Sequence, residues 1–482
     1  MTYNTPLYSA LINYTKENKI PFHMPGHKQG SGISARFKTS VFDIDLTELL
    51  ETDNLHAPEG PIQEAQQLAA AAFGAQHSFF LINGSTCGIQ AMVASICNPG
   101  DILIVDRNCH SSVISSLILC GVTPKYIYPE YIADLGVVGG IHPAKIQEML
   151  IQCPQAKGVL ITSPTYYGIC SDVKKIAQIV HSHGKILLVD EAHGAHFCFH
   201  KKLPQSALQA GADMCVQSAH KTLPALTQSS LLHVNSDRID LPRLKSCLKL
   251  FQSSSPSFIL MAYLDIARSI MQNSGEKMLN DLIEWTEELR DRINRIGKIY
   301  CLGKELIGTC HIQDMDATRV VIHFGKLGLT GYQVARELNM RYNIQVEMAD
   351  FHNIICIVSP GNNKQQLEYL GQCSQQISSI IYNKKTFNRT GYIKPIFKQP
   401  PIGQYTITPR EVFYSESEII PIEKAVDRVC ADTIVSFPPG IPILCPGEVV
   451  CYDIIKYISE IIACGGKVVG LEDGCNIRVV KN

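Results

Sequence analysis

Short apolar runs that alternate with helix-length segments occupy residues 61–235, and they constrain the fold more than any other feature of this sequence. Six runs have the length and composition of strands: Ile102–Val105, Lys125–Tyr128, Gly158–Thr162, Ile186–Asp190, Met214–Gln217 and Ser230–Val234. The segments between them carry apolar residues at helical spacing, for example Ile89, Met92, Val93 and Ile96. Apolar strands separated by helices are typical of a mostly parallel sheet with helices on both faces. The sequence therefore predicts an α/β fold.

The rest of the 482-residue chain differs from this region, and we predict four parts in all. Residues 1–60 include an acidic stretch without lysine or arginine, and we expect an N-terminal arm. Residues 61–275 form the predicted large domain. Long charged helices followed by alternating strands predict a smaller α+β domain over residues 276–385. A proline-containing stretch opens residues 386–482, which we expect to form a linker and a C-terminal module.

Composition narrows the possible function classes. Hydrophobic residues make up 45% of the chain, charged residues 18%, and the formal net charge is −1, which indicates neither disorder nor a nucleic-acid-binding surface. None of the 18 cysteines stands in a C-x-x-C pair, and most lie in apolar stretches where a thiol behaves as a small hydrophobic group. There is no secretory signal and no apolar run long enough to cross a membrane. We therefore expect a cytoplasmic protein with reduced cysteines.

Three polar positions that follow strands fit one cofactor together. Lys221 lies in an uncharged segment, where burial would lower its pKa and prepare its amine for Schiff-base formation. Asp190 is the first charge after an apolar strand, and a buried carboxylate needs a cationic partner such as a protonated pyridine. Gly84, Ser85 and Thr86 open a helix whose first N–H groups can hold a phosphate. Pyridoxal 5′-phosphate carries the matching aldehyde, pyridine nitrogen and phosphate.

Each of these positions also has a plainer interpretation. A single lysine is usually a surface residue, Asp190 could be an ordinary loop carboxylate, and Ser85 could be a simple N-cap. A rival site is offered by three histidines in an H-x-x-H-x-x-x-H pattern, which could bind a metal: His193, His196 and His200. The surrounding glycine and phenylalanines favour a turn over a helix there, so we expect no metal.

Together these residues resemble the fold-type-I, pyridoxal-phosphate-dependent ornithine/lysine/arginine decarboxylase family, especially its short bacterial arginine and lysine decarboxylases. The likeness runs nearly end to end, and two segments are specific to that family among pyridoxal enzymes: Pro25-Gly26-His27-Lys28 and His56-Ala57-Pro58-Glu59-Gly60. Further matching segments are Asn83–Gly88, Arg107–His110, Asp190–Gly194, Ser218–Lys221, Leu226–Ser230 and Pro438–Gly440. The resemblance implies an enzyme that decarboxylates a basic amino acid. L-arginine, giving agmatine and CO₂ for polyamine biosynthesis, is our first choice, and lysine or ornithine is the alternative. Transamination or carbon–sulfur lysis by a related enzyme remains a further alternative.

The resemblance also implies roles for individual residues. Lys221 would carry the cofactor, Asp190 would pair with its ring nitrogen, and His110 would stack on its ring. His220 would be a proton donor beside the reacting atoms. The cofactor-binding set also includes a ring neighbour and the phosphate-binding residues: His193, Gly84, Ser85, Thr86 and Ser218. Ser111 replaces a lysine that many members carry, and residues 222–225 lack the glycines of many relatives, but neither departure touches a predicted catalytic residue.

The distal cation of a basic substrate requires an acidic partner. The candidates are Glu448 and the acids of the N-terminal stretch: Asp43, Asp45, Glu48, Glu51, Asp53 and Glu59. We expect most of the latter to be solvated and at most one or two to face the site. Because the family builds its sites at a subunit interface, we expect a homodimer or a dimer of dimers. The His27-Lys28 segment would serve the partner's site.

Overall fold

The computed structural model describes most of the chain. The described residues are Glu17, 19–22, Gly26, Lys28, 31–34, Glu48, 52–383, 401, 403–437 and 440–481. Most of the predicted arm and residues 386–400 of the predicted linker lie outside them. So do four residues to which the sequence assigns candidate roles: His27, Asp43, Asp45 and Glu51.

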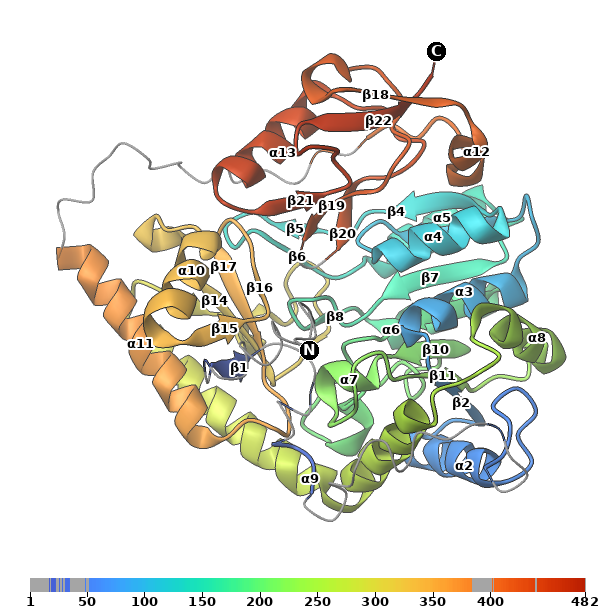
Figure 1. Ribbon diagram of the computed structural model, residues 1–482, viewed down its shortest axis with the longest axis horizontal. Helices are drawn as coiled ribbons and strands as arrows, with labels where there is room; N and C mark the ends of the chain where they lie inside the picture. Colours follow the sequence, from blue (N-terminus) through green and yellow to red (C-terminus); the bar gives the residue numbers. More distant parts are fainter. Residues whose placement is uncertain are drawn as a thin grey trace, which may run out of the picture.

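A seven-stranded sheet forms the centre of the large domain (Figure 1). Its strands, in order across the sheet, are β2 (His77–Leu81), β11 (Ser230–Val234), β10 (Met214–Gln217), β9 (Ile186–Asp190), β7 (Gly158–Thr162), β3 (Ile102–Asp106) and β4 (Thr123–Ile127). The five strands from β10 to β4 are parallel, whereas β11 is antiparallel to both of its neighbours. The predicted mostly parallel α/β sheet is confirmed. The sequence pattern did not predict β2, and β4 starts earlier than expected.

Helices cover both faces of this sheet because successive strand residues point to opposite sides and are apolar on each. The helices of one face are α3 (Gly84–Ile96), α4 (Ser111–Cys120) and α8 (Leu241–Phe251), and those of the other are α5 (Pro143–Gln152) and α6 (Val173–Ser182). In β3, Leu103 and Val105 join the first core and Ile104 joins the second. Further elements of this part are α2 (Pro61–Phe73), α7 (Ala219–Thr222), a 3₁₀ turn (Phe197–Phe199) and the hairpin of β5 (Tyr131–Ile132) and β6 (Val137–Val138).

A second, antiparallel sheet lies in the smaller α+β part. Its order is β12 (Tyr300–Cys301), β14 (Arg319–His323), β17 (Asn353–Ile357) and β16 (Met348–Ala349). Its helices are α9 (Phe258–Asn294), α10 (Gly331–Tyr342) and α11 (Lys364–Asn383), with 3₁₀ turns at Lys304–Leu306 and Gly325–Leu327. Two short strand pairs add connections: β1 (Ile20–Phe22) with β15 (Ile344–Val346), and β8 (Ile169–Cys170) with β13 (Asp314–Met315). The predicted boundary at residue 275 remains a prediction, and it falls inside α9.

The C-terminal module has its own apolar core, which includes Ile434, Leu444, Ile458 and Ile477. Its elements are α12 (Pro409–Tyr414), the pair β18 (Ser417–Pro421) and β22 (Asn476–Val480), a 3₁₀ turn (Ile422–Lys424), the three strands β20 (Ile441–Leu444), β19 (Ile434–Phe437) and β21 (Lys467–Val469), and α13 (Tyr452–Ala463). In Figure 1 the β19–β20 hairpin reaches from this module toward β5 and β6 of the large domain.

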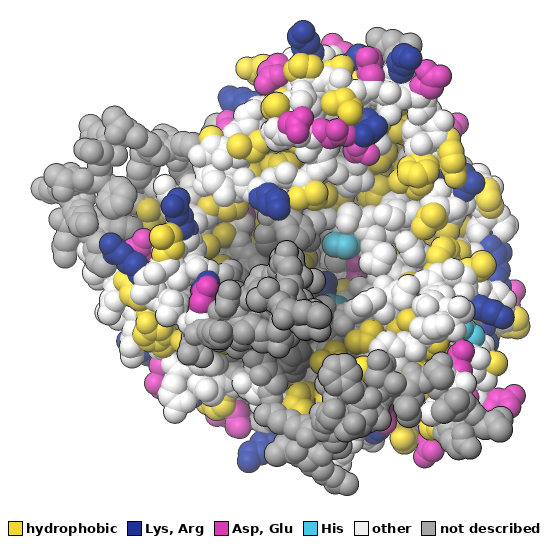
Figure 2. Space-filling view, in the orientation of Figure 1, with side chains coloured by type: hydrophobic (Ala, Val, Ile, Leu, Met, Phe, Trp, Pro, Cys, Tyr) yellow, Lys and Arg dark blue, Asp and Glu magenta, His cyan; other side chains and the backbone are white. Residues whose placement is uncertain are grey.

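The surface agrees with a chain of nearly balanced charge. On the face drawn in Figure 2, the described lysines and arginines are interspersed with aspartates and glutamates, and they form no continuous basic patch there. No helix among the described residues combines the length and the apolar character that crossing a bilayer requires.

Candidate active site

The carboxyl ends of several strands bring the predicted site residues to one edge of the sheet, where ligands of such sheets bind. Asp190 ends β9, and Lys221 lies in α7, shortly after β10. Since β11 is antiparallel to both β10 and β2, the last two strands run in the same direction. Gly84, which follows β2, therefore lies at the same edge, as does His110, which follows β3.

The amine of Lys221 is shielded from solvent at this edge of the sheet, although the residue as a whole is only partly buried. Its Nζ is 3.0 Å from Nε2 of His193. Desolvation lowers the pKa of the Lys221 amine. Asp190 and Glu347 oppose this effect, and the charge of Arg319 adds to it. A lowered pKa favours the neutral, nucleophilic form of the amine.

Asp190 is 3% exposed, so its carboxylate is largely shielded from solvent. Its Oδ1 accepts a hydrogen bond from the backbone N–H of Ala192 at 3.1 Å. Burial raises the pKa of Asp190, and the charge of Lys221 and the Ala192 hydrogen bond only partly offset this. A protonated pyridine nitrogen would supply the missing positive charge, so this carboxylate fits the predicted cofactor.

The start of α3 fits a phosphate. The Asn83 side chain makes no capping hydrogen bond to the first turn of this helix. Gly84 has a φ of +73°, a conformation that disfavours other residues. The Ser218 hydroxyl donates to the Ser85 hydroxyl at 2.9 Å, which joins α7 to α3, and Thr86 is exposed beside them. Uncapped N–H groups and hydroxyls at a helix N-terminus form an anion-binding arrangement.

Two of the predicted histidines are held by local hydrogen bonds that fix their neutral tautomers. His110 precedes α4, and its Nδ1 accepts from the Ser112 backbone N–H at 3.2 Å. Burial and the charge of Lys221 lower the pKa of His110 to about 4. The Nδ1 of His220 donates to the carbonyl of Ser229 at 3.0 Å. In the neutral ring, Nε2 of His220 is therefore the atom that can take up a proton.

The three histidines of the alternative metal site bind different partners. His193 contacts the amine described above, and His196 lies 3.2 Å from the carboxylate of Asp316. His200 accepts a hydrogen bond from the backbone N–H of Lys202. Across the described residues, no three histidine, cysteine, aspartate or glutamate side chains converge on a point where a metal could sit.

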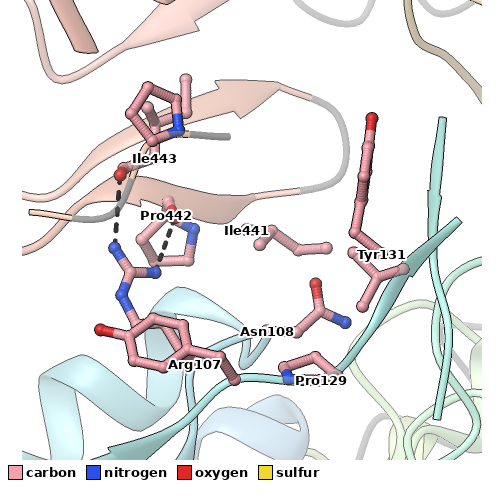
Figure 3. Close-up of a pocket in the computed structure, with 10 residues that line it drawn as sticks. Arg107, Asn108, Pro129, Tyr131, Ile441, Pro442 and Ile443 are labelled. Carbon is pink, nitrogen blue, oxygen red and sulfur yellow. Dashed lines mark hydrogen bonds between the residues drawn. The ribbon is translucent and has the colours of Figure 1, made fainter. Parts of the chain in front are cut away.

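Glu448 does not lie where a partner of the substrate's distal cation would have to lie. It is fully buried, and its two carboxylate oxygens accept from Nε and Nη2 of Arg107, both at 2.9 Å. Figure 3 shows the same guanidinium directed at the β19–β20 hairpin, where it also donates to the carbonyls of Pro442 and Ile443. The Cys445 N–H donates to the carboxylate as well. This carboxylate anchors the C-terminal module to the large domain, and its contacts leave no place for a substrate cation.

Two other candidates also have local roles. The Asp53 carboxylate accepts hydrogen bonds from backbone N–H groups around the start of α2, including those of Gly60 and Ile62. Although burial acts in the opposite direction, these bonds lower the pKa of Asp53, as expected for a helix-capping carboxylate. Glu59 is exposed. Lys28, predicted to reach a partner's site, is 1% exposed in its own chain, where it lies close to Arg319 and Glu347.

Sequence reasoning missed Arg319. It is the first residue of β14, 2% exposed, and its Nη2 lies 3.2 Å from Nδ1 of His193. The available signal was a single charged residue at the start of the apolar run Val320–Ile322, because a charge in such a place must have a specific partner. That partner lies 126 positions away in the chain and could not be named from the sequence.

Comparison with known proteins agrees with this arrangement. The family model described as Orn/Lys/Arg decarboxylase, major domain, matches residues 5–366, and the model of the C-terminal domain of the same family matches residues 394–475. Arginine decarboxylase of Bacillus anthracis is 40% identical, with 99% of this chain and 98% of that protein aligned. The Bacillus subtilis (strain 168) arginine decarboxylase is 38% identical over the same shares.

Among solved structures, lysine decarboxylase A from Pseudomonas aeruginosa superposes with a TM-score of 0.79 and 22% identity, covering 99% of this chain and 80% of that one. At this identity the superposition shows the fold alone. The matches of both family models and of nearly full-length relatives show the family as well as the fold. The chain belongs to the Orn/Lys/Arg decarboxylase family.

Proposed function

We propose that this chain decarboxylates L-arginine with the help of pyridoxal 5′-phosphate and releases agmatine and CO₂. The two Bacillus relatives described above, which align with nearly the whole chain, are arginine decarboxylases, and this supports the choice of substrate. Within the molecule, one observation carries the proposal: Lys221 and the buried Asp190 both lie at the carboxyl edge of the sheet, where Ser218 joins α7 to the start of α3.

The residues at this edge suit the cofactor. When bound, pyridoxal 5′-phosphate supplies an aldehyde that condenses with amines and a ring that accepts the electrons left by CO₂. Lys221 would hold the aldehyde carbon, and Asp190 would keep the ring nitrogen protonated. Ser85, Ser218 and the first turn of α3 would bind the phosphate.

The chain's own groups would then orient the reactants and move one proton. His110, which is neutral at physiological pH because its pKa is about 4, would present an uncharged ring to the cofactor face. His220 would receive and return a proton through Nε2, because its Nδ1 is engaged by the Ser229 carbonyl. Either His220 or Lys221 would deliver that proton to the α-carbon after CO₂ has left.

Glu48 is the remaining described candidate for the substrate's distal cation. Glu448 and Asp53 are engaged elsewhere, and Glu59 is exposed. Oε1 of Glu48 is buried and makes no hydrogen bond within the described part of the chain, so a guanidinium would satisfy it. We expect Glu48→Gln to raise the KM for arginine about tenfold, as loss of a charge-assisted hydrogen bond would. A Glu59→Gln variant is the control, and an unchanged KM for Glu48→Gln would remove Glu48 from the site.

The decisive assay measures CO₂ release from arginine, lysine and ornithine by the purified chain supplied with pyridoxal 5′-phosphate, and identifies the amine product. Release of agmatine from arginine, faster than release of either diamine, is the expected result. A preference for lysine would assign that substrate instead, and formation of a keto acid would replace decarboxylation by transamination.

The role of Lys221 has its own test. Lys221→Ala should lose turnover and should show no adduct on the corresponding peptide after borohydride reduction, whereas Lys249→Ala, an exposed control in α8, should retain both. Ordinary activity in Lys221→Ala would refute the assignment. A homodimer and a cytoplasmic location remain predictions, to be checked by sedimentation and by fractionation of cells.

A further inference from the structure

The guanidinium of Arg319 is buried without the partners that such a group normally has. The residue is 2% exposed, and its Nε and Nη1 make no hydrogen bond within the described part of the chain. Its Nη2 contacts Nδ1 of His193 at 3.2 Å. Buried donors without acceptors are rare in stable proteins and point to a role other than stability.

The contacts of His193 on its two sides are not independent. Arginine has only donors, so Nδ1 of His193 must be the acceptor in this contact and cannot carry a proton. The neutral ring then carries its proton on Nε2, which lies 3.0 Å from Nζ of Lys221. An Nε2–H group can only donate, so the amine of Lys221 must accept and must therefore be neutral. A protonated Lys221 in this contact would require a histidine without any ring proton, which water at ordinary pH does not allow.

We propose that Arg319 is a positioning residue that fixes the tautomer of His193 and thereby holds Lys221 as a neutral amine. The inference rests on the proposed function only in taking Lys221 as the amine that binds the cofactor. Whenever Lys221 is not bound to the cofactor, its proton is kept off by a hydrogen-bond relay that starts at Arg319.

The surrounding charges agree with this relay. Burial lowers the pKa of Lys221 against the charges of Asp190 and Glu347, which favour the protonated amine, and the charge of Arg319 adds to the effect of burial. Burial, followed by the charges of Lys221 and Arg319 and then by His110 and His220, lowers the pKa of His193 well below its ordinary value. A neutral His193 ring is what the two hydrogen bonds, from Arg319 to Nδ1 and from Nε2 to Lys221, require.

The backbone around Arg319 keeps the guanidinium at its place. The Arg319 N–H donates to the Asp316 carbonyl, and the Arg319 carbonyl accepts from Arg290 at 2.6 Å. Gly168 packs against the stem of the side chain, where an added Cβ would approach the Arg319 Cβ to 2.7 Å. Burial lowers the pKa of Arg319, and the carboxylates of Asp316 and Glu347 oppose this effect.

The first test measures the amine of Lys221 directly. The cofactor-free full chain is mixed with pyridoxal 5′-phosphate at a series of pH values, and the initial rate of adduct formation is read as the borohydride-reduced mass of the Lys221 peptide. In Arg319→Met we expect the midpoint of this rate profile to rise by about one pH unit, which is about a tenfold slower uptake at a pH below both midpoints.

The matched control is Arg290→Met. Arg290 binds the carbonyls of Leu302, Ala317 and Arg319, so its loss disturbs the same strand without touching His193. The midpoint of Arg290→Met should stay at the wild-type value. An unchanged midpoint in Arg319→Met, or an equal rise in both variants, would overturn the proposal.

The second test reads the tautomer of His193 in the wild-type protein, so its main readout stands even if Arg319→Met fails to fold. In the ¹⁵N spectrum of histidine-labelled, cofactor-free chain, assigned with His193→Asn, His193 should carry its proton on Nε2. A proton on Nδ1 refutes the proposal, and so does a raised midpoint in Arg319→Met with an unchanged tautomer, since that would reflect charge alone. Failure to release CO₂ from arginine would refute the proposed function and leave both readouts intact.

Discussion

Two buried arginines at the same edge of the molecule have opposite surroundings. Arg107 is bound by both oxygens of Glu448 and by two backbone carbonyls. Although burial opposes this, Cys445 and Glu448 raise its pKa well above the ordinary value. Within the described residues, the side chain of Arg319 makes one hydrogen bond, to His193, and burial lowers its pKa despite nearby acids. Both guanidiniums are less than one-tenth exposed.

The difference separates an anchor from a functional group. A buried ion pair whose hydrogen bonds are all made holds two parts of a protein in a fixed arrangement. Loss of either partner destabilises the protein, because the other charge then stays buried and unpaired. A buried cation whose donors are unused contributes little to stability and is retained because of what it does to a neighbour. Arg107 and Glu448 therefore hold the structure together, whereas the role proposed for Arg319 is to act on His193 and Lys221.

The largest effect should come from breaking the anchor. Glu448→Leu leaves the Arg107 guanidinium buried without its counter-charge, and we expect the free energy of unfolding to fall by about 3–5 kcal/mol. Urea denaturation of the full chain measures this change. The double variant Arg107→Met, Glu448→Leu should regain most of the loss, because no charge is then left unpaired. If the double variant is as unstable as the single one, the pair is not the anchor described here.

The next effect is the pH dependence of the free energy of unfolding that we expect from Lys28, a buried lysine near Arg319. Burial lowers the pKa of Lys28 from 10.5 to about 7, while Glu347 opposes this and Arg319 adds to it. At a pH between about 7 and 10.5, folding therefore releases a proton from the Lys28 amine. Stability should therefore rise with pH above 7, by at most about 1.4 kcal/mol per pH unit. Lys28→Met should remove this part of the slope, and the exposed control Lys249→Met should keep it. Equal slopes in wild type and Lys28→Met would show that Lys28 is not held neutral.

The smallest effect on stability should come from Arg319 itself. Arg319→Met removes a poorly satisfied buried cation, so the free energy of unfolding should stay within about 1 kcal/mol of wild type or rise. Arg107→Met, by contrast, should lose as much as Glu448→Leu, because it leaves the carboxylate unpaired. Urea denaturation of both arginine variants makes the comparison direct. A large loss in Arg319→Met would make Arg319 a second anchor.

Local patterns were sufficient for most strands of the large domain, although they did not predict β2. Strands such as Ile186–Asp190 could be predicted because they are apolar throughout, and a charge that ends such a strand marks the site edge. Patterns were insufficient for α9, which begins at Phe258 although the charged region starts near residue 276. Residues before and after position 276, such as Met261 and Ile283, nevertheless belong to the same apolar core. A change of composition along a chain therefore need not coincide with the boundary of an element.

The sequence by itself determined the α/β architecture and the strand-end positions of Lys221 and Asp190, because both follow from residue types within a few positions of each other. Only the tertiary structure decided that Glu448 binds Arg107, 341 positions away, and that Arg319 binds His193. The physical reason is that the partner of a buried charge is set by the topology of the sheet and by the docking of the parts around it. No local pattern records those relations.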